Sequence, residues 1–375
     1  MEKVRLCDVC DFQGGSQPPK NEWSFEQKDG YIRMLQIRDF TQTRNVEKEY
    51  IKLTSSTKTC VTEDILIARY GASIGKILTG LSGAYNVAIM KTIPNEGILN
   101  KSYLKYYLLS NYFQNGINSV GARAAQAGFN KEDLSKLYIP VVSLVQQKLI
   151  VDKLNKLTTF IGKRKKQLEK LDELVKSRFV EMFGDCKSMV SMNELCSIIT
   201  DGTHQPPRFQ ESGIPFIFVS NLVGNVVTYN AEKFISEDTY AELYKRTPIE
   251  IGDLLLSTVG SYGHPAVVTE DRKFLFQRHI AYLKPRHNMV NSFYLHSALL
   301  APDGQRQIEE KVKGIAQKTL NLSEIKKIVV PLPTIEEQNQ FEKFVNQIDK
   351  SKFEIKQSLE KLELLKKALM QKYFG

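Results

Sequence analysis

The stretch QQKLIVDKLNKLTTFIGKRKKQLEKLDELVKSRFVEMFG, residues 146–184, decides how this chain is organised. Its apolar residues recur at alternating steps of four and three, which is the pattern of a helix that packs in a coiled coil. The seam positions are Ile150, Leu154, Leu157, Ile161, Arg164, Leu168, Leu171, Val175, Arg178 and Met182. We predict one helix of about 55 Å, because each residue adds about 1.5 Å. Glycine favours a helix stop, so we expect this helix to end at Phe183-Gly184.

A second seam of the same length lies 191 residues further along the chain and ends at Phe374-Gly375. Its positions are Phe341, Val345, Ile348, Lys352, Ile355, Leu359, Leu362, Lys366, Leu369 and Tyr373. A single stripe of this kind also fits a core helix of a globular domain, but two equal seams most simply pack on each other. The segment from Asp185 to Ser191 is too short to carry the chain back along the first helix. We therefore expect antiparallel helices, with Met1 and Gly375 at the same end.

The repeat continues into the sequence that precedes each long helix. The matched pairs include Leu6-Cys7 with Leu195-Cys196, Asp64–Gly71 with Asp253–Gly260, Asn86–Lys91 with His279–Lys284, and Asn130–Pro140 with Asn321–Pro331. Short apolar runs bounded by Gly, Pro and Asn predict strands at 65–68, 87–90, 254–257 and 280–283. Helices are predicted at 99–115 and 291–300.

These patterns predict a mixed α/β fold with a pseudo-two-fold internal repeat. Two globular α/β domains are separated by two long antiparallel helices that form a coiled coil. The predicted bounds are 1–144 for the first globular domain, 145–184 for the central helix, 185–334 for the second globular domain and 335–375 for the C-terminal helix.

Composition limits the kind of protein. The chain has 375 residues, enough for two or three domains, and its net charge of +10 suggests a polyanionic partner. The first residues, MEKVRLCDVCDF, contain no apolar signal-peptide region, and no stretch of about 18 apolar residues occurs. We therefore expect a cytoplasmic protein that does not bind membranes.

The five cysteines are too few for a disulfide framework. Cys7 and Cys10 form half of a zinc site, but no second pair completes it. The match of Leu6-Cys7 to Leu195-Cys196 places Cys10 opposite the apolar Ile199. We therefore expect Cys10 in the core, and no metal site.

Polar loops that differ between the two copies supply Arg, Lys, Gln, Asn, Ser and His beside Gly and Tyr. Such side chains contact phosphates and base edges, and although each one alone also fits a solvated loop, the set on a basic chain favours duplex DNA. The predicted DNA-binding residues of the first copy are Gln17, Lys20, Arg33, Gln36, Arg38, Arg69, Tyr70, Ser73, Lys76, Arg123 and Gln126. Those of the second copy are His204, Gln205, Arg208, Ser220, Asn221, Thr258, Ser261, Tyr262, His264, Lys313, Gln317 and Lys318.

Catalytic motifs are absent. Gly71–Lys76 is similar to a phosphate loop, but three residues separate its glycines where four are needed. Gln17–Lys20 and Gln205–Arg208 lack the amide or acid and the aromatic with which amino-methyltransferases hold a flipped base. No His-Glu-x-x-His, Gly-x-Ser-x-Gly or Gly-x-Gly-x-x-Gly motif occurs. We expect a binding protein without catalytic residues or a cofactor of its own.

Several motifs resemble those of the specificity subunit of type I restriction-modification systems, and the likeness covers essentially the whole chain. They are Asp201-Gly202-Thr203-His204, Pro215-Phe216-Ile217, Ser220-Asn221-Leu222, Gly252–Ser257, and the proline turns that lead through Gln146-Gln147 and Glu337-Gln338 into the long helices. The first copy departs from the pattern, with Gly14-Gly15-Ser16-Gln17 in place of the Asp-Gly-x-His opening.

The resemblance implies that each globular domain is a target-recognition domain for one half of a split, asymmetric DNA site, and that the helices set the gap between the halves. It also implies partners: two methyltransferase subunits that dock on the chain, and restriction and translocation subunits that can join them. S-adenosylmethionine would then belong to the methyltransferase partner.

Two other kinds of protein fit parts of the sequence. One is a self-contained DNA methyltransferase or nuclease with an unrecognised site. The other is a coiled-coil bridging protein that does not bind DNA. Neither the target bases nor the gap length follows from the sequence.

Overall fold

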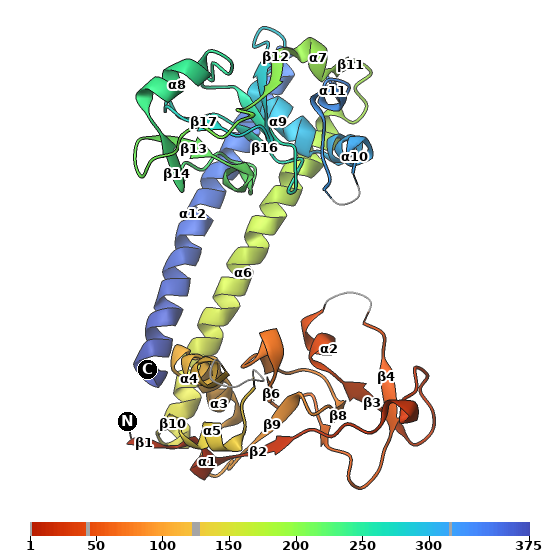
Figure 1. Cartoon of the computed structure of the whole chain (residues 1–375), viewed down its shortest axis with the longest axis vertical. Helices are drawn as coiled ribbons and strands as arrows, with labels where there is room; N and C mark the ends of the chain where they lie inside the picture. The colour runs from red at the N-terminus through yellow and green to blue at the C-terminus, as the bar shows by residue number, and fades with distance from the viewer. Residues whose placement is uncertain (1, 43–45, 122–127, 315–316) are drawn as a thin grey trace. The chain divides into compact units, whose positions relative to one another are not determined.

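The computed structural model describes residues 2–42, 46–121, 128–314 and 317–375. The chain forms two compact units: unit 1 comprises Met1–Arg164 and Ser358–Gly375, and unit 2 comprises Lys165–Gln357. Each unit holds one copy of the repeat and part of both long helices, which are labelled in Figure 1. Lobe 1 denotes the residues before α6 (Leu144–Phe183), and lobe 2 those between α6 and α12 (Ile335–Phe374). The domain bounds predicted from the sequence remain predictions.

Lobe 1 contains two four-stranded sheets and a separate antiparallel pair, β1-β10. One sheet is antiparallel with order β2-β9-β6-β7, and the other has order β4-β3-β8-β5 with β3 and β8 parallel. The strands are β1 (Glu2–Arg5), β2 (Cys10–Gly14), β3 (Tyr31–Leu35), β4 (Glu49–Lys52), β5 (Thr59–Cys60), β6 (Leu66–Ala68), β7 (Ile77–Leu78), β8 (Gly83–Tyr85), β9 (Ile89–Pro94) and β10 (Tyr138–Val141). The helices are α1 (Leu6–Val9), η1 (Lys20–Glu22), α2 (Ile37–Thr41), η2 (Gly71–Ser73), α3 (Lys101–Leu108), α4 (Asn111–Gly121) and α5 (Lys131–Ser135).

Lobe 2 repeats this plan. Its main sheet is antiparallel with order β12-β18-β15-β16, its second sheet is β14-β13-β17 with β13 and β17 parallel, and β11 pairs with β19. The strands are β11 (Met189–Ser191), β12 (Cys196–Asp201), β13 (Ile214–Ile217), β14 (Lys233–Ile235), β15 (Leu254–Ser257), β16 (Pro265–Val267), β17 (Leu275–Phe276), β18 (Ile280–Pro285) and β19 (Val329–Pro331). The helices are α7 (Met192–Leu195), η3 (Val219–Leu222), α8 (Glu237–Tyr244), α9 (Ser292–Leu300), α10 (Pro302–Lys311) and α11 (Leu322–Ile325).

The predicted secondary structure is confirmed with two changes. The predicted strands at 65–68, 254–257 and 280–283 are present as β6, β15 and β18, whereas the strand predicted at 87–90 begins only at Ile89. The helix predicted at 99–115 is broken into α3 and α4. The break follows from Ser110, whose hydroxyl oxygen accepts from Phe113 N at 3.3 Å and so caps a new helix.

The predicted alignment of the two copies was wrong by three residues at their start, where it matched Leu6-Cys7 with Leu195-Cys196. Cys10 begins β2 directly after α1, and Cys196 begins β12 directly after α7. Both thiols are buried and burial raises the pKa of each to about 12. Cys10 is therefore equivalent to Cys196 and not to Ile199, and the prediction that Cys10 lies in the core is confirmed.

The match across β9 and β18 was wrong by two residues. In lobe 1, Ile89 pairs with Ala68, and in lobe 2, Ile280 pairs with Ser257. Because Ala68 and Ser257 are matched in the repeat, Ile89 is equivalent to Ile280, and Ala88 is equivalent to His279. The sequence match had assigned Asn86 to His279 instead. A two-residue slip leaves every side chain on its original face of the strand, so the apolar pattern does not reveal it.

In unit 2, parts of α6 and α12 run in opposite directions. The ring of Phe341 lies 5.5 Å from that of Phe179, and Lys352 Nζ lies 2.6 Å from an oxygen of Asp172. Residues later in α12 therefore contact residues earlier in α6, as the antiparallel coiled coil requires.

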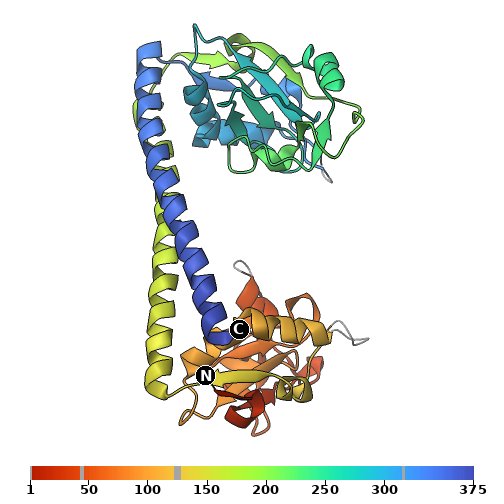
Figure 2. The same cartoon turned by 90° about the vertical axis from the view of Figure 1, so that its left-hand side faces the viewer.

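In unit 1, the last turns of α12 share a core with the first turns of α6. Phe374 is buried with Ile150 and Leu154. Lys3 donates from Nζ to the carbonyl oxygen of Gly375 at 3.3 Å, and Figure 2 shows the two ends of the chain side by side in this unit. The expectation placed Met1 at the same end as Gly375; Met1 lies outside the described residues, and the contact that agrees with this expectation is made by Lys3.

Burial along both long helices follows the predicted seam. Every described seam residue is buried or half-buried, including Arg178 and Lys352, while most positions between them are exposed. Over the parts of the chain that the structure describes, no helix is both long and apolar enough to cross a membrane.

Candidate nucleic-acid interface

A turn with two glycines recurs at the end of the main sheet of each lobe. In lobe 1, Gly71 and Gly75 have φ of 69° and 78°, and in lobe 2, Gly260 and Gly263 have φ of 73° and 79°. These left-handed conformations favour glycine, which explains why the turn keeps its glycines while its polar residues differ. We call residues 69–76 and 258–264 the glycine turns.

A partly buried glutamine fixes each glycine turn on the helices of its lobe. Gln114 donates from Nε2 to Gly75 O at 2.9 Å and to Leu108 O at 2.7 Å. Its equivalent, Gln305, donates to Gly263 O at 3.1 Å and to Leu299 O at 2.8 Å. The turns are thus held in the same way although they present different side chains.

In lobe 1 the glycine turn carries Arg69, Tyr70, Ser73 and Lys76. The Arg69 guanidinium lies 5.1 Å from the centre of the Tyr70 ring, and its Nε donates to Phe129 O at 3.3 Å. Tyr70 is 40% exposed and Lys76 is exposed, whereas Ser73 is half-buried. The turn therefore presents a cation and an aromatic ring at the surface.

In lobe 2 the glycine turn lies beside the loop that contains Lys313 and Lys318. Val259 forms a bridge to Thr319, which itself bridges to Lys313. Tyr262 donates its hydroxyl to Glu309 at 2.5 Å, and Lys318 Nζ donates to the same carboxylate at 3.0 Å.

The structure therefore brings together the seven residues predicted on the glycine turn of lobe 2 and on the loop beside it. Those that lie on the two neighbouring loops are Thr258, Ser261, Tyr262, His264, Lys313, Gln317 and Lys318. Thr258 is buried, and His264 is half-buried with Nδ1 3.0 Å from Asn225 Oδ1.

A hollow of about 290 Å³, which we call the lobe 2 hollow, lies at this place. Its lining includes Asp201, Thr258, Val259, Arg278, Gln317 and Leu320. Asp201 accepts from His204 Nε2 at 2.9 Å and from Arg246 at 2.7 Å, so both of its oxygens are paired. The hollow thus collects polar side chains from four separate stretches of the chain.

Sequence reasoning did not find Arg278 and His279 as lining residues. Arg278 is exposed, and its Nε donates to Nε2 of His279 at 3.4 Å. Burial, together with the positive charge of Arg278, lowers the pKa of His279, which suits a neutral ring that accepts this hydrogen bond. A correct register for β9 and β18 would have placed these residues beside the glycine turn.

Other predicted residues are engaged with acids inside lobe 1. Arg33 is paired with Asp39 at 2.6 Å, and both Gln36 and Arg38 donate to Glu49. These contacts position the start of α2.

Asn221 is buried and its side chain is fully used. Its Oδ1 accepts from Phe218 N at 3.0 Å, and its Nδ2 donates to Thr228 O at 2.9 Å and to Asn230 O at 3.2 Å. These hydrogen bonds hold the turn after η3 together, and the assignment of Asn221 to the DNA interface remains a prediction.

The remaining predicted residues divide into two groups. The exposed ones on loops or short helices are Gln17, Lys20, His204, Gln205, Arg208 and Ser220. Arg123 and Gln126 lie outside the described residues.

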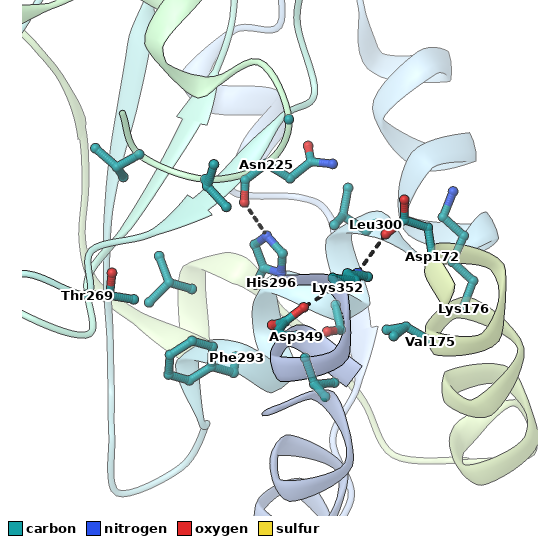
Figure 3. A pocket seen from close by; sticks show the side chains of 16 residues that line it. Asp172, Val175, Lys176, Asn225, Thr269, Phe293, His296, Leu300, Asp349 and Lys352 are labelled. Atoms are coloured by element: carbon teal, nitrogen blue, oxygen red, sulfur yellow. Dashed lines mark hydrogen bonds and ion pairs between the residues drawn. The ribbon is translucent and has the colours of Figure 1, made fainter. Parts of the chain in front are cut away.

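A second cavity of unit 2, of about 400 Å³, contains none of the predicted residues (Figure 3). In it, Lys352 lies between Asp172 and Asp349, at 2.6 and 3.5 Å, and His296 donates from Nε2 to Asn225 O at 3.1 Å. These contacts join α9 to the loop after η3 and brace the two long helices. Among the described residues, no group of three or more His, Cys, Asp or Glu side chains is placed to hold a metal ion.

Comparison with known proteins identifies relatives of the whole chain. The specificity subunit of the EcoBI type I restriction enzyme of Escherichia coli is 24% identical, over 99% of this chain and 85% of that protein. The MjaVIII type I specificity subunit of Methanocaldococcus jannaschii is 22% identical, over 98% of this chain and 91% of that protein.

Solved structures share the fold. One of them comes from a structure that describes complex assembly and conformational transition of the type I R-M system. It has a TM-score of 0.60 and 20% sequence identity, and the match covers 100% of this chain and 97% of that one. The crystal structure of a type I restriction-modification S subunit from M. genitalium has a TM-score of 0.53 at 16% identity, over 100% and 96%.

The family comparison covers both copies of the repeat. The model of the type I restriction modification DNA specificity domain matches residues 1–172 and, separately, residues 188–366. Each match contains one lobe with its glycine turn and most of the long helix that follows it. The chain therefore belongs to the family of type I restriction modification DNA specificity domains, of which it carries two copies.

Proposed function

We propose that this chain is the DNA-specificity subunit of a type I restriction-modification complex, and that each lobe recognises one half of a bipartite, asymmetric DNA site. The long helices set the gap between the halves and dock methyltransferase subunits. The observation that carries this proposal is the duplication: two family matches, each with a polar glycine turn on one lobe and a 40-residue helix after it.

The chemistry of the lobes suits DNA. Lysine and arginine neutralise phosphates, which gives an affinity that falls with salt, while side chains on the glycine turns discriminate bases. A wrong base pair typically costs about 1 to 3 kcal/mol, so two separated half-sites give more selectivity than one.

The methyl transfer itself belongs to the partners in this proposal. Two methyltransferase subunits would bind S-adenosylmethionine and the target adenine, and restriction subunits would join the same complex. This chain supplies the surface that selects the site.

The test is methylation mapping of DNA exposed to the chain together with its methyltransferase subunits. We expect methylated adenines within one bipartite sequence of fixed gap. The purified chain alone, given DNA and a radiolabelled methyl donor, is expected to transfer no label. Transfer by the chain alone would favour the self-contained methyltransferase instead.

A coiled-coil bridging protein is distinguished by a gel shift. The chain is mixed with duplex DNA over a series of salt concentrations, and we expect binding that weakens steeply as salt rises. No binding at low salt would support the bridging protein.

A further inference from the structure

The lobe 2 hollow occupies the place that an arginine side chain fills in lobe 1. Arg69 N donates to Ala88 O at 2.8 Å, and Thr258 N donates to His279 O at 2.9 Å. Arg69 and Thr258 are therefore equivalent, and the shorter side chain leaves space where the longer one lies.

The residues around Arg69 correspond to the lining of the hollow. In lobe 1 its guanidinium lies against Val87 O, Phe129 O and the Tyr70 ring, and Nη1 is 3.3 Å from where a Cβ on Gly14 would stand. The β-ladders and bridges have the same register in both lobes, which makes these four residues equivalent to four residues of lobe 2. The four equivalents all line the hollow, namely Arg278, Leu320, Val259 and Asp201.

A guanidinium is thus available at the same place in both lobes, but from different segments of the chain. Lobe 1 supplies Arg69 from the glycine turn, and lobe 2 supplies Arg278 from the residue two before β18. Among the described residues, Arg278 donates a hydrogen bond only from Nε, to His279, so both Nη atoms remain for a ligand. The ion pairs of Asp201 in the described part of the chain are with His204 and Arg246, and none joins it to Arg278.

We propose that the lobe 2 hollow is a DNA subsite in which the Arg278 guanidinium contacts the duplex, at the place where lobe 1 has the guanidinium of Arg69. The Nη atoms donate to a pair of acceptors on the duplex, either two phosphate oxygens or the O6 and N7 atoms of a guanine. Gln317 and Thr258 line the same hollow and supply further polar groups. This inference rests on the proposed function and names a specificity subsite within it.

The experiment measures binding of the full chain to its mapped target duplex by fluorescence anisotropy. Arg278→Val installs the residue that lobe 1 has at this position, and we expect binding about tenfold weaker. Arg286→Val removes the same charge at the other end of β18, where Nε donates to Glu194 O, and should bind within about twofold of the wild type.

A second variant tests the equivalence directly. Thr258→Arg combined with Arg278→Val moves the guanidinium onto the glycine turn, as in lobe 1, and should regain most of the lost affinity. Thermal unfolding confirms that both variants are folded. Wild-type affinity in Arg278→Val, or no recovery in the folded double variant, overturns the proposal.

Two further measurements identify the acceptors. If Arg278 contacts phosphate, the loss is uniform across altered targets and the salt dependence falls by about one ion; if it contacts guanine, preference relaxes at a single base pair. If the proposed function were wrong, the wild-type chain itself would show no sequence preference, which distinguishes that outcome from the failure of the Arg278 subsite alone.

Discussion

Gln147 and Gln338 are glutamines with no exposed surface, each near the start of a long helix. Gln338 accepts from Asn291 N at 2.8 Å and donates to Met289 O at 3.2 Å and Pro333 O at 3.0 Å. Gln147 makes the equivalent three contacts in lobe 1. Each side chain thus satisfies backbone groups of the lobe and fixes the long helix to it.

Gln338→Leu keeps the volume but leaves three backbone groups without partners. We expect the free energy of unfolding to fall by about 3 kcal/mol, since each buried unpaired group costs about 1–3 kcal/mol. Urea unfolding followed by circular dichroism measures the change. Gln340→Leu, at an exposed position on the same helix, is the control and should change it by less than about 0.5 kcal/mol. Equal stability of the two variants would show that these hydrogen bonds contribute little.

At this scale the sequence identifies residue types but not their partners. Arg33 and Asn221 have the chemistry of DNA-contacting residues, yet Arg33 is paired with Asp39 and Asn221 bonds to backbone atoms. Arg278 shows the reverse case. Its position beside Thr258 depends on a strand pairing that joins distant parts of the chain, which no local pattern indicates.

Among the elements, α6 and α12 were the most predictable. Their period is long and regular, and their ends at Phe183 and Phe374 agree with the predicted stops. The short strands were less predictable in register, because a fully buried strand has no polar face to align. The α3–α4 break depends on one capping serine, Ser110, within an otherwise continuous apolar pattern.

The two long helices should act as a ruler for the gap between half-sites. We propose inserting one matched heptad in each, between Arg164 and Lys165 in α6 and between Gln357 and Ser358 in α12, where both helices pass from one unit to the other. Seven residues add about 10 Å and keep the seam in phase, so the preferred gap should grow by about three base pairs.

Methylation mapping with the partner subunits measures the gap. Inserting the heptad in α6 alone is the control, because it shifts one seam against the other and should lower stability without defining a new gap. An unchanged gap in the double insertion would contradict the ruler.

For the whole molecule, the duplication implies that the two recognition functions are separable. Each lobe has its own pair of sheets and its own buried core, and each fixes its glycine turn by its own glutamine, Gln114 or Gln305. The contacts that shape one recognition surface therefore come from within that lobe. Replacing one lobe should therefore not alter the recognition surface of the other lobe.

We therefore predict that exchanging residues 1–144 for the corresponding domain of another family member changes only one half of the target. The junction should lie just before Gln147, so that the incoming lobe supplies equivalents of Ile98 O, Asn100 N and Val142 O to that glutamine. Methylation mapping of the chimera should give one new half-site and one unchanged half-site, at the original gap. The reciprocal exchange of residues 185–334 serves as the control and should alter the other half. Altered bases in both halves after a single exchange would mean that the lobes recognise DNA jointly, through contacts that neither copy of the repeat contains alone.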